Sequence, residues 1–396
     1  MKKYHEEHQL LRDSLRQFIE KEITPNLQQW EDQEECPKHL FKKMGELGFI
    51  GANFPEEVGG SGMDFLASEI VMAELSYANI GGFTGSYYAH TFLPLPLLNA
   101  MGTDEQKDKY LRPAIQGDMI ASLAITEPGA GSDVKGISTF GEDAGDHFIL
   151  NGSKIFITNA NIGDFMVVVT RTGEGHKMTL LIVENHWEGV SCSPIDKKLG
   201  WHTSDTAQVF FDNVKVPKEN VIGEINKGFY YLMNNIQEER LLMSVMATHT
   251  AQYAYDEAVK YVRDRKAFGS TLSKLQVMRH KIAKMATQLE SCHAMTDRAL
   301  LAFMDIGPKA TEVITMSKVY TAETAMEIIN QAIQAHGGNG YVETYGVARA
   351  WRDTRLFSIG AGSSEIMYEI ISKFEIDRIK HEKQFVASRS GKMSTT

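Results

Sequence analysis

The chain has 396 residues, 41 lysines and arginines, 51 aspartates and glutamates, and a formal net charge of −10 at pH 7. Hydrophobic residues make up 43% and charged residues 23%, which is typical of a globular protein. At ~100–200 residues per domain, this length predicts two or three domains. Because an acidic surface repels a phosphate backbone, we expect no nucleic-acid partner.

The cysteines and the apolar segments exclude two further classes of protein. Cys36, Cys192 and Cys292 are far apart and odd in number, which argues against a disulfide framework and against a CxxC metal or redox motif. We therefore expect no metal site. The N-terminus has no apolar signal region, and the longest aliphatic run is far shorter than the ~20 residues that span a bilayer. We expect a soluble, cytoplasmic protein with no membrane span.

Residues 1–120 are expected to form an N-terminal helical domain. Two segments carry apolar side chains at three-to-four spacing, the first with Leu10, Leu11, Leu15, Phe18 and Ile19, the second with Leu40, Phe41, Met44 and Leu47. The first helix should stop near Pro25, and residues 68–78 should form another helix.

Residues 121–225 are expected to form a middle β domain. Turn residues separate short β-rich runs, namely HFILNG, KIFITNA, DFMVVVTR, MTLLIVEN and AQVFFDNVKV. Asn151-Gly152 lies between the first two runs and predicts a hairpin turn there. Several short strands at regular spacing are typical of a small sandwich or barrel.

Residues 226–380 are expected to form a C-terminal helical bundle, followed by a flexible tail at 381–396. One apolar stripe runs from Phe229 to Val262 and a second from Leu275 to Leu289. A third helix should start near Pro308 and end at Gly337-Gly338. Long helices with short connections indicate a bundle, so the predicted fold is mainly α with a β insert.

Several glycine-bearing motifs could carry chemistry: TEPGAGSD at 126–133, NGSKIFITN at 151–159, RKAFG at 265–269, QAHGGNGY at 334–341 and GAGSSE at 360–365. Backbone N–H groups and hydroxyls in the first motif suit a phosphate or the edge of a heterocycle, although a tight loop explains it equally well. Arginines at the end of a long helix suit either the helix dipole or a pyrophosphate. No GxGxxG, P-loop or GxSxG motif is present.

In their order and spacing, these motifs resemble those of the acyl-CoA dehydrogenases over roughly residues 5–375, and PEEVGGSGMD near residue 55 and FFDNVKVP near residue 211 fit as well. The resemblance implies an N-terminal helical domain, a middle β-barrel or sandwich domain and a C-terminal four-helix bundle, with FAD bound non-covalently. It also implies an acyl-CoA substrate, electron-transfer flavoprotein as the electron acceptor, a role in fatty acid β-oxidation and a homotetramer.

The resemblance also assigns FAD contacts by position. In the middle domain they are Leu123, Ile125, Thr126, Ser132, Phe156, Ile157 and Thr158. Thr158 would lie near flavin N5, and Phe156 stands where many members carry tryptophan. In the bundle they are Arg265, Gln276, Gln334, Gly337, Gly338, Ser363 and Glu365. Arg265 and Gln276 match positions that hold the pyrophosphate from the adjacent subunit.

The last motif departs from the commonest family pattern. Most members read Tyr-Glu-Gly-Thr where this chain reads Gly360-Ala361-Gly362-Ser363, and that glutamate is their catalytic base. The Ala361 side chain cannot accept a proton, although its N–H could still donate to the thioester oxygen. In the long-chain and isovaleryl-CoA types the base lies on a bundle helix directly before an arginine, an arrangement that Glu239-Arg240 matches.

On this resemblance Glu239 removes the substrate α-proton while the β-hydride goes to flavin N5, which yields a trans-2-enoyl-CoA. Substrate contacts would come from Ser132, Tyr230, Arg240, Ala361 and Gly362. Small residues at 360–362 leave room near the reacting carbons, so a branched chain and a long chain are both admitted.

Other interpretations stay open from the sequence. Glu238 and Glu239 could be a solvated pair on an exposed helix face. The chain could also be an acyl-CoA oxidase of the same fold, which passes electrons to oxygen. The remaining alternatives are a nucleic-acid-binding relative and a helical scaffold without activity.

Overall fold

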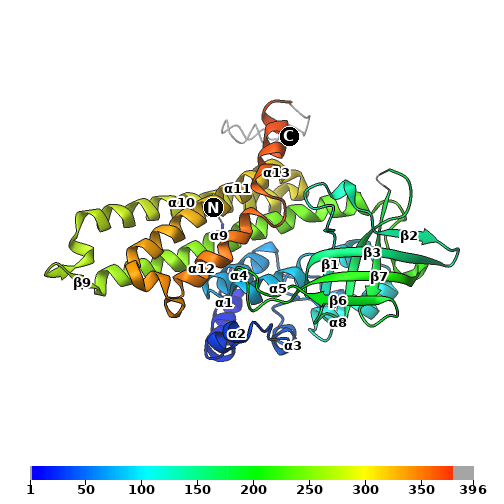
Figure 1. Ribbon diagram of the computed structural model, residues 1–396, viewed down its shortest axis with the longest axis horizontal. Coiled ribbons are helices and arrows are strands. Elements are labelled where there is room, and N and C mark those ends of the chain that lie inside the picture. Colours follow the sequence, from blue (N-terminus) through cyan, green and yellow to red (C-terminus); the bar gives the residue numbers. More distant parts are fainter. Residues whose placement is uncertain (1, 176, 378–396) are drawn as a thin grey trace. The chain divides into compact units, whose positions relative to one another are not determined.

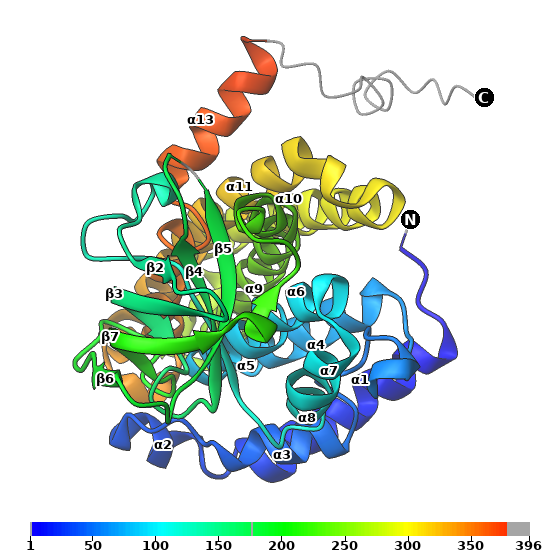
Figure 2. The same cartoon turned by 90° about the vertical axis from the view of Figure 1, so that its right-hand side faces the viewer.

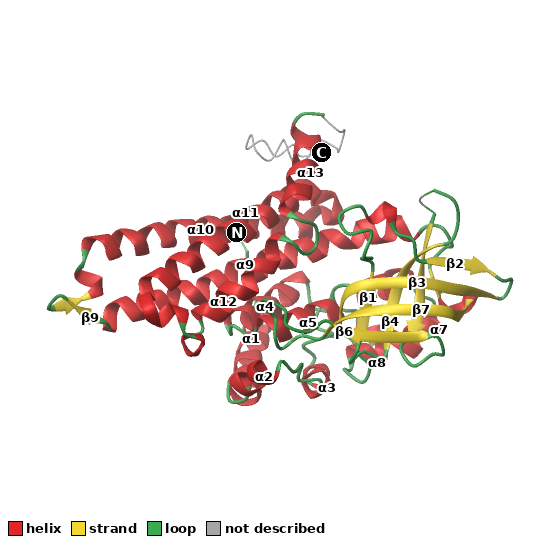
Figure 3. Ribbon diagram, in the orientation of Figure 1, coloured by secondary structure: helices red, strands yellow, loops and turns green. Residues whose placement is uncertain are grey.

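The structure is a computed structural model that describes residues 2–175 and 177–377 (Figure 1). Strands occupy the middle of the sequence and helices both flanks, which confirms the predicted order of helices, β insert and helices (Figure 3). The predicted tail at 381–396 lies outside the described residues. The chain divides into a sheet unit, Lys3–Ile236 with Ala348–Asp353, and a bundle unit, which holds Gln237–Val347 and the described residues from Thr354 onward.

The helices of the sheet unit are α1 (Glu6–Phe18), α2 (Leu27–Gln33), α3 (His39–Glu46), α4 (Phe65–Tyr77), α5 (Gly81–Thr91), α6 (Pro94–Met101), α7 (Asp104–Gln106) and α8 (Arg112–Ile115). A π-turn at Ile19–Ile23 extends α1 and ends before Pro25, as predicted. Leu10 and Leu47 are 64% and 52% exposed, so the buried stripes of α1 and α3 are narrower than the sequence predicts.

The strands of the sheet unit are β1 (Ala121–Ala124), β2 (Phe140–Asp143), β3 (His147–Thr158), β4 (Phe165–Arg171), β5 (Met178–Glu184), β6 (Val190–Pro194), β7 (Thr206–Pro217) and β8 (Val221–Ile222). They form one sheet in the order β6-β7-β3-β2-β4-β5-β8, with β1 paired to β4. Figure 2 labels β2 to β7 of this sheet. Side chains from β3, β4, β5 and β7 share one buried cluster, so the sheet encloses a common core as a sandwich or barrel does.

The predicted hairpin turn at Asn151-Gly152 is wrong, because β3 continues through it. The pair forms a bulge opposite β7, where the register shifts between Leu150 and Gly152. Gly152 has φ +139, and a Cβ there would lie 2.7 Å from Thr139 Cα. Asn151 Oδ1 accepts a hydrogen bond from the Asn213 backbone N–H at 2.9 Å. Pairing with a distant strand therefore decides the conformation of this Asn-Gly pair.

The remaining helices are α9 (Gly228–Asp264), which begins in the sheet unit, α10 (Gln276–Ile306), α11 (Thr311–His336), α12 (Val347–Thr354) and α13 (Ser364–Glu375). The three long helices of the bundle are confirmed. A small hairpin of β9 (Lys266–Ala267) and β10 (Ser270–Thr271) joins α9 to α10. Lys284 Nζ lies 2.7 Å from Glu327 Oε1, so α10 and α11 lie side by side and antiparallel (Figure 1). No helix in the described ranges has the length and apolar character to cross a membrane.

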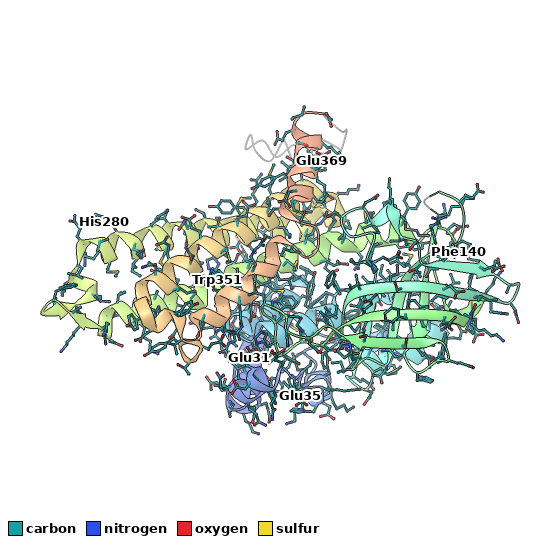
Figure 4. The ribbon with its side chains drawn as sticks, in the orientation of Figure 1. Glu31, Glu35, Phe140, His280, Trp351 and Glu369 are labelled. Carbon is teal, nitrogen blue, oxygen red and sulfur yellow. The ribbon has the colours of Figure 1, made fainter. Side chains whose placement is uncertain are left out.

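Residues 348–353 of α12 join the sheet unit through a buried ion pair. Arg352 donates to Glu31 Oε2 at 2.6 Å, and Figure 4 labels Glu31 on α2 and Trp351 on α12. Asp353 Oδ1 accepts from the Trp201 backbone N–H at 2.6 Å. Burial, together with the nearby Glu31 carboxylate, raises the pKa of Asp353 to about 7. A short segment far along the chain is thus fixed to the N-terminal helices.

Two glycines of α5 allow the segment around Trp201 to pack closely against this helix. A Cβ on Gly85 would lie 2.1 Å from the Trp201 ring, and one on Gly82 would lie 2.4 Å from Thr203 Oγ1. The Phe83 backbone N–H donates to Thr203 Oγ1 at 3.0 Å. These contacts hold the segment around Trp201 directly against α5.

We expect Gly85→Ala to lower the free energy of unfolding by ~1–3 kcal/mol, because the buried ring must move to admit a methyl group. Thermal or denaturant unfolding measures the loss. In a Trp201→Leu background the same substitution should cost clearly less, since the ring that it strikes is gone. Equal costs in both backgrounds would contradict the packing described here.

Candidate active site

Two of the motifs meet at one end of the sheet. The Ile155 backbone N–H donates to the Thr126 carbonyl at 2.8 Å, and Lys154 Nζ donates to the Ile125 carbonyl at 2.9 Å. The segment that follows β1 is therefore bonded to the second half of β3. This contact brings Ile125 and Thr126 next to the segment that carries Phe156 and Thr158.

A buried ion pair stabilises the contact between the segment that follows β1 and the second half of β3. Lys154 Nζ lies 2.8 Å from Glu127 Oε1, and the two side chains are 0% and 3% exposed. Glu127 also accepts hydrogen bonds from the backbone N–H groups of Ser138 and Thr139, at 2.6 and 2.9 Å. The structure thus adds Lys154 and Glu127, to which the sequence assigned no role, to the residues that shape the site.

The charges of this pair follow from its surroundings. Burial alone would raise the pKa of Glu127, but the Lys154 ammonium and the hydrogen bonds from Ser138 and Thr139 outweigh it and lower the pKa to about 2. Burial lowers the pKa of Lys154 to about 8, with Glu127 opposing the shift. Both groups are therefore ionised at pH 7.

The predicted FAD contacts at this end differ in exposure. Phe156 is 63% exposed and has φ +60, whereas Leu123 and Ile157 are 7% and 2% exposed. The two buried residues therefore offer little surface to a ligand. Ser132 is exposed, and no atom lies within 4 Å of a Cβ built on Gly129 or Gly131. An exposed aromatic ring beside an open glycine loop fits the edge of a flavin, although the chain alone carries no redox group.

The bundle unit holds a second cluster. Glu239 and Arg240 are 5% and 6% exposed, so the interpretation of Glu238 and Glu239 as a solvated pair is wrong. Glu238 Oε1 is shielded from solvent and accepts no hydrogen bond from the described residues. Burial, and after it the Glu239 carboxylate, raises the pKa of Glu238 to about 8. At pH 7 Glu238 therefore holds a proton.

The turn at 360–363 lies against these residues. Ala361 and Gly362 have φ +50 and +94, and a left-handed alanine is strained by on the order of 1–3 kcal/mol. Arg240 Nε donates to the Ala361 carbonyl at 3.3 Å. Lys318 Nζ donates to the Gly362 carbonyl at 2.5 Å, and Lys318 is only 1% exposed. No motif in the sequence pointed to Lys318; its one signal is a charge inside an otherwise buried stretch of α11.

Two other predicted contacts flank the turn. Ser363 is the N-cap residue of α13 and Glu365 lies exposed in its first turn. Hydrogen bonds from its own backbone N–H and from Ser363 lower the pKa of Glu365. Tyr230, a predicted substrate contact, is 65% exposed near the start of α9 and belongs to the sheet unit.

The remaining predicted FAD contacts gather at the opposite end of the bundle. Arg265 is exposed just beyond α9, Gln276 begins α10, and Gln334, Gly337 and Gly338 lie at the end of α11. Asn339 Nδ2 donates to Tyr261 Oη at 3.0 Å, which ties the end of α11 to the end of α9. Glu239 and Asp264 are 25 residues apart in α9, or ~38 Å at 1.5 Å per residue. The two clusters of the bundle are therefore far apart within one chain.

Comparison with known proteins identifies relatives along nearly the whole chain. Family models for the N-terminal, middle and C-terminal domains of acyl-CoA dehydrogenase match residues 5–118, 122–214 and 226–375. The chain is 40% identical to a 3-(aryl)acrylate reductase of Clostridium sporogenes, over 93% of this chain and 98% of the relative. It is 35% identical to the mitochondrial long-chain specific acyl-CoA dehydrogenase of Rattus norvegicus, over 93% and 86%. The crystal structure of acyl-CoA dehydrogenase from Geobacillus kaustophilus matches with a TM-score of 0.90 at 36% identity, over 94% of this chain and 99% of that chain.

We expect Lys154→Met and Glu127→Gln each to destabilise the sheet unit by ~3–5 kcal/mol, because each leaves a buried partner uncompensated. The double variant should lose much less than the sum of the two. Lys218→Met, which breaks a more exposed pair with Asp143, is the matched control and should cost at most ~1 kcal/mol. Strict additivity in denaturant unfolding would show that Lys154 and Glu127 do not act as a pair.

Proposed function

The chain belongs to the acyl-CoA dehydrogenase family, and from this premise we propose that it dehydrogenates an acyl-CoA thioester between its α and β carbons with bound FAD. The observation that carries the proposal is the buried Glu239 directly before Arg240, whose guanidinium contacts the Ala361 turn. The usual base position is alanine here, so the carboxylate must come from another element. Glu239 of α9 is the carboxylate that we assign to this role.

The two neighbouring glutamates would have different roles. Glu238 holds a proton at pH 7, because its pKa is raised to about 8. Glu239 is then the carboxylate of the pair and takes the α-proton of the substrate. Arg240 orients the turn, and the Ala361 N–H donates to the thioester oxygen, where negative charge develops as the proton leaves. A placed general base of this kind contributes ~10²–10⁴-fold to the rate.

FAD would be held by the residues that the family resemblance assigns to it, and the exposed Phe156 and the open Gly129–Gly131 loop fit such a ligand. When bound, FAD supplies the acceptor for the β-hydride. The Lys154–Glu127 pair fixes the backbone at Ile125 that would border the flavin. We also propose electron-transfer flavoprotein as the electron acceptor, in line with the same resemblance.

A second copy of the chain would complete the cofactor site. Glu239 and the end of α9 beside Arg265 are ~38 Å apart along one helix, which exceeds the length of an extended dinucleotide. One FAD cannot contact both ends of the same bundle. We therefore propose that Arg265, Gln276 and Gln334–Gly338 serve the FAD of a neighbouring subunit, as in the tetramers of the family.

The 40% identity to a 3-(aryl)acrylate reductase supports a second candidate function, reduction of the double bond of an arylacrylate or a related enoyl compound. The same residues serve in reverse, with Glu239 giving its proton to the α-carbon. Anaerobic assays in both directions separate these functions. An oxidase would instead show rapid flavin reoxidation by air in the absence of an electron-transfer partner.

We expect Glu239→Gln to slow flavin reduction by at least ~10²-fold while FAD and acyl-CoA still bind, because the amide keeps the shape but not the basicity. Glu238→Gln is the matched control one residue away, and it should keep most of the rate because it replaces a group that is already neutral at pH 7. Anaerobic stopped-flow absorbance compares the two variants. A normal rate in Glu239→Gln with a slow rate in Glu238→Gln would reverse the assignment.

We expect Arg265→Ala to lose FAD on extensive dialysis and to dissociate more readily, since a charge-assisted bond is worth ~1.5–3 kcal/mol. Arg263→Ala, which removes another exposed charge at the same helix end, should keep its FAD. Flavin absorbance of the denatured extract and sedimentation measure the two effects. Full flavin retention in Arg265→Ala would mean that Arg265 only complements the helix dipole.

A further inference from the structure

The Ala361 turn has a conformation that its own sequence does not favour. Alanine at φ +50 persists only where the surrounding structure imposes it, and Gly362 follows at φ +94. A Cβ on Gly362 would lie 2.6 Å from Met367 Cε, so the chain also needs glycine there for packing. Something outside the turn must therefore fix the preceding residue.

Two buried cations supply that constraint. Arg240 of α9 donates to the Ala361 carbonyl at 3.3 Å, and Lys318 of α11 donates to the Gly362 carbonyl at 2.5 Å. Successive carbonyls of the turn are thus held from two different helices. The two residues are 6% and 1% exposed, and hydrogen bonds from charged donors are strong when water is excluded.

The Ala361 carbonyl belongs to the peptide plane between Ala361 and Gly362, and holding it fixes that plane. The Ala361 N–H belongs to the plane before, so its direction follows from the held plane and the backbone angles of Ala361, where φ is +50. The backbone N–H of Ala361 donates to no acceptor within residues 2–175 and 177–377. It is thus left available to a ligand, and its direction depends on how the turn is held.

We propose that Lys318 is a positioning residue, which holds the Ala361–Gly362 turn so that the Ala361 N–H meets the thioester oxygen of the substrate. This inference rests on the proposed function, since it needs a thioester as the ligand. Lys318 itself would touch neither substrate nor flavin. It acts by donating a hydrogen bond to a backbone carbonyl, which requires a long side chain with a charged end.

The test compares two CoA ligands that differ at the carbonyl. One is a saturated acyl-CoA thioester, measured on the oxidised enzyme with the Glu239→Gln substitution, which slows its turnover. The other is the S-alkyl-CoA thioether of equal length, which lacks the oxygen. We expect Lys318→Met to reduce the thioester-over-thioether preference roughly 10-fold, while thioether affinity and FAD content stay unchanged.

Controls separate this role from a general effect on the bundle. Lys284→Met removes a lysine of the same bundle that pairs with Glu327 and does not contact the turn, and it should leave the preference intact. Lys318→Arg keeps a cationic donor and should restore part of the preference. If Lys318→Met does not fold, Lys318→Gln takes its place, because it keeps a polar end in the buried site but is too short to reach the carbonyl.

The outcomes are distinct. Loss of the preference in Lys318→Met, with recovery in Lys318→Arg, supports the proposal. An unchanged preference, or an equal loss of affinity for both ligands, overturns the positioning role while the proposed function stands. If the Glu239→Gln enzyme binds neither ligand, the proposed function fails, and this inference fails with it.

Discussion

Burial of ionised side chains is the constraint on which both the cluster of the sheet unit and the cluster of the bundle unit depend. Arg240 and Lys318 remain in the bundle at the cost of desolvation, which the carbonyls of the Ala361 turn offset. The Lys154 side chain can be buried in the sheet unit because the Glu127 carboxylate compensates its charge. Each of these charged side chains donates a hydrogen bond to a backbone carbonyl and so stabilises the conformation of that segment. In each unit, buried charges thus hold the backbone of a segment that is proposed to meet flavin or substrate.

The proposed base, Glu239, and the Ala361 turn are connected in the structure through Arg240. On the proposed function, Glu239 of α9 would take the role that the family resemblance gives to a glutamate at position 361, and the residue that follows it, Arg240, bonds to the turn at that position. The proposed base and the proposed carbonyl donor are thus linked through the Arg240 hydrogen bond, although they come from segments far apart in the sequence. Burial, and after it the neighbouring Glu239, raises the pKa of Glu238 to about 8, which favours the protonated form of Glu238.

Much of the fold was predictable, because α9, α10 and α11 each carry a long apolar stripe that local periodicity reveals. The hairpin turn predicted at Asn151-Gly152 is wrong, because contacts with Asn213 and Thr139 set the backbone of this pair rather than its own turn preference. The base and the cofactor positions came from ordered motifs and still await test. Lys154 and Lys318 could not be found that way, because their partners are 27 and 44 residues distant and neither contact leaves a local pattern.

The account is tested most directly by mixing the purified protein anaerobically with saturated acyl-CoAs of varied length and branching while flavin absorbance is recorded. We expect a yellow protein whose flavin bleaches with at least one of these thioesters and recovers when an electron-transfer flavoprotein is added. The most efficient thioester would also identify the acyl chain that the protein prefers. A colourless protein, or a flavin that no acyl-CoA reduces and no enoyl-CoA reoxidises, would contradict the account.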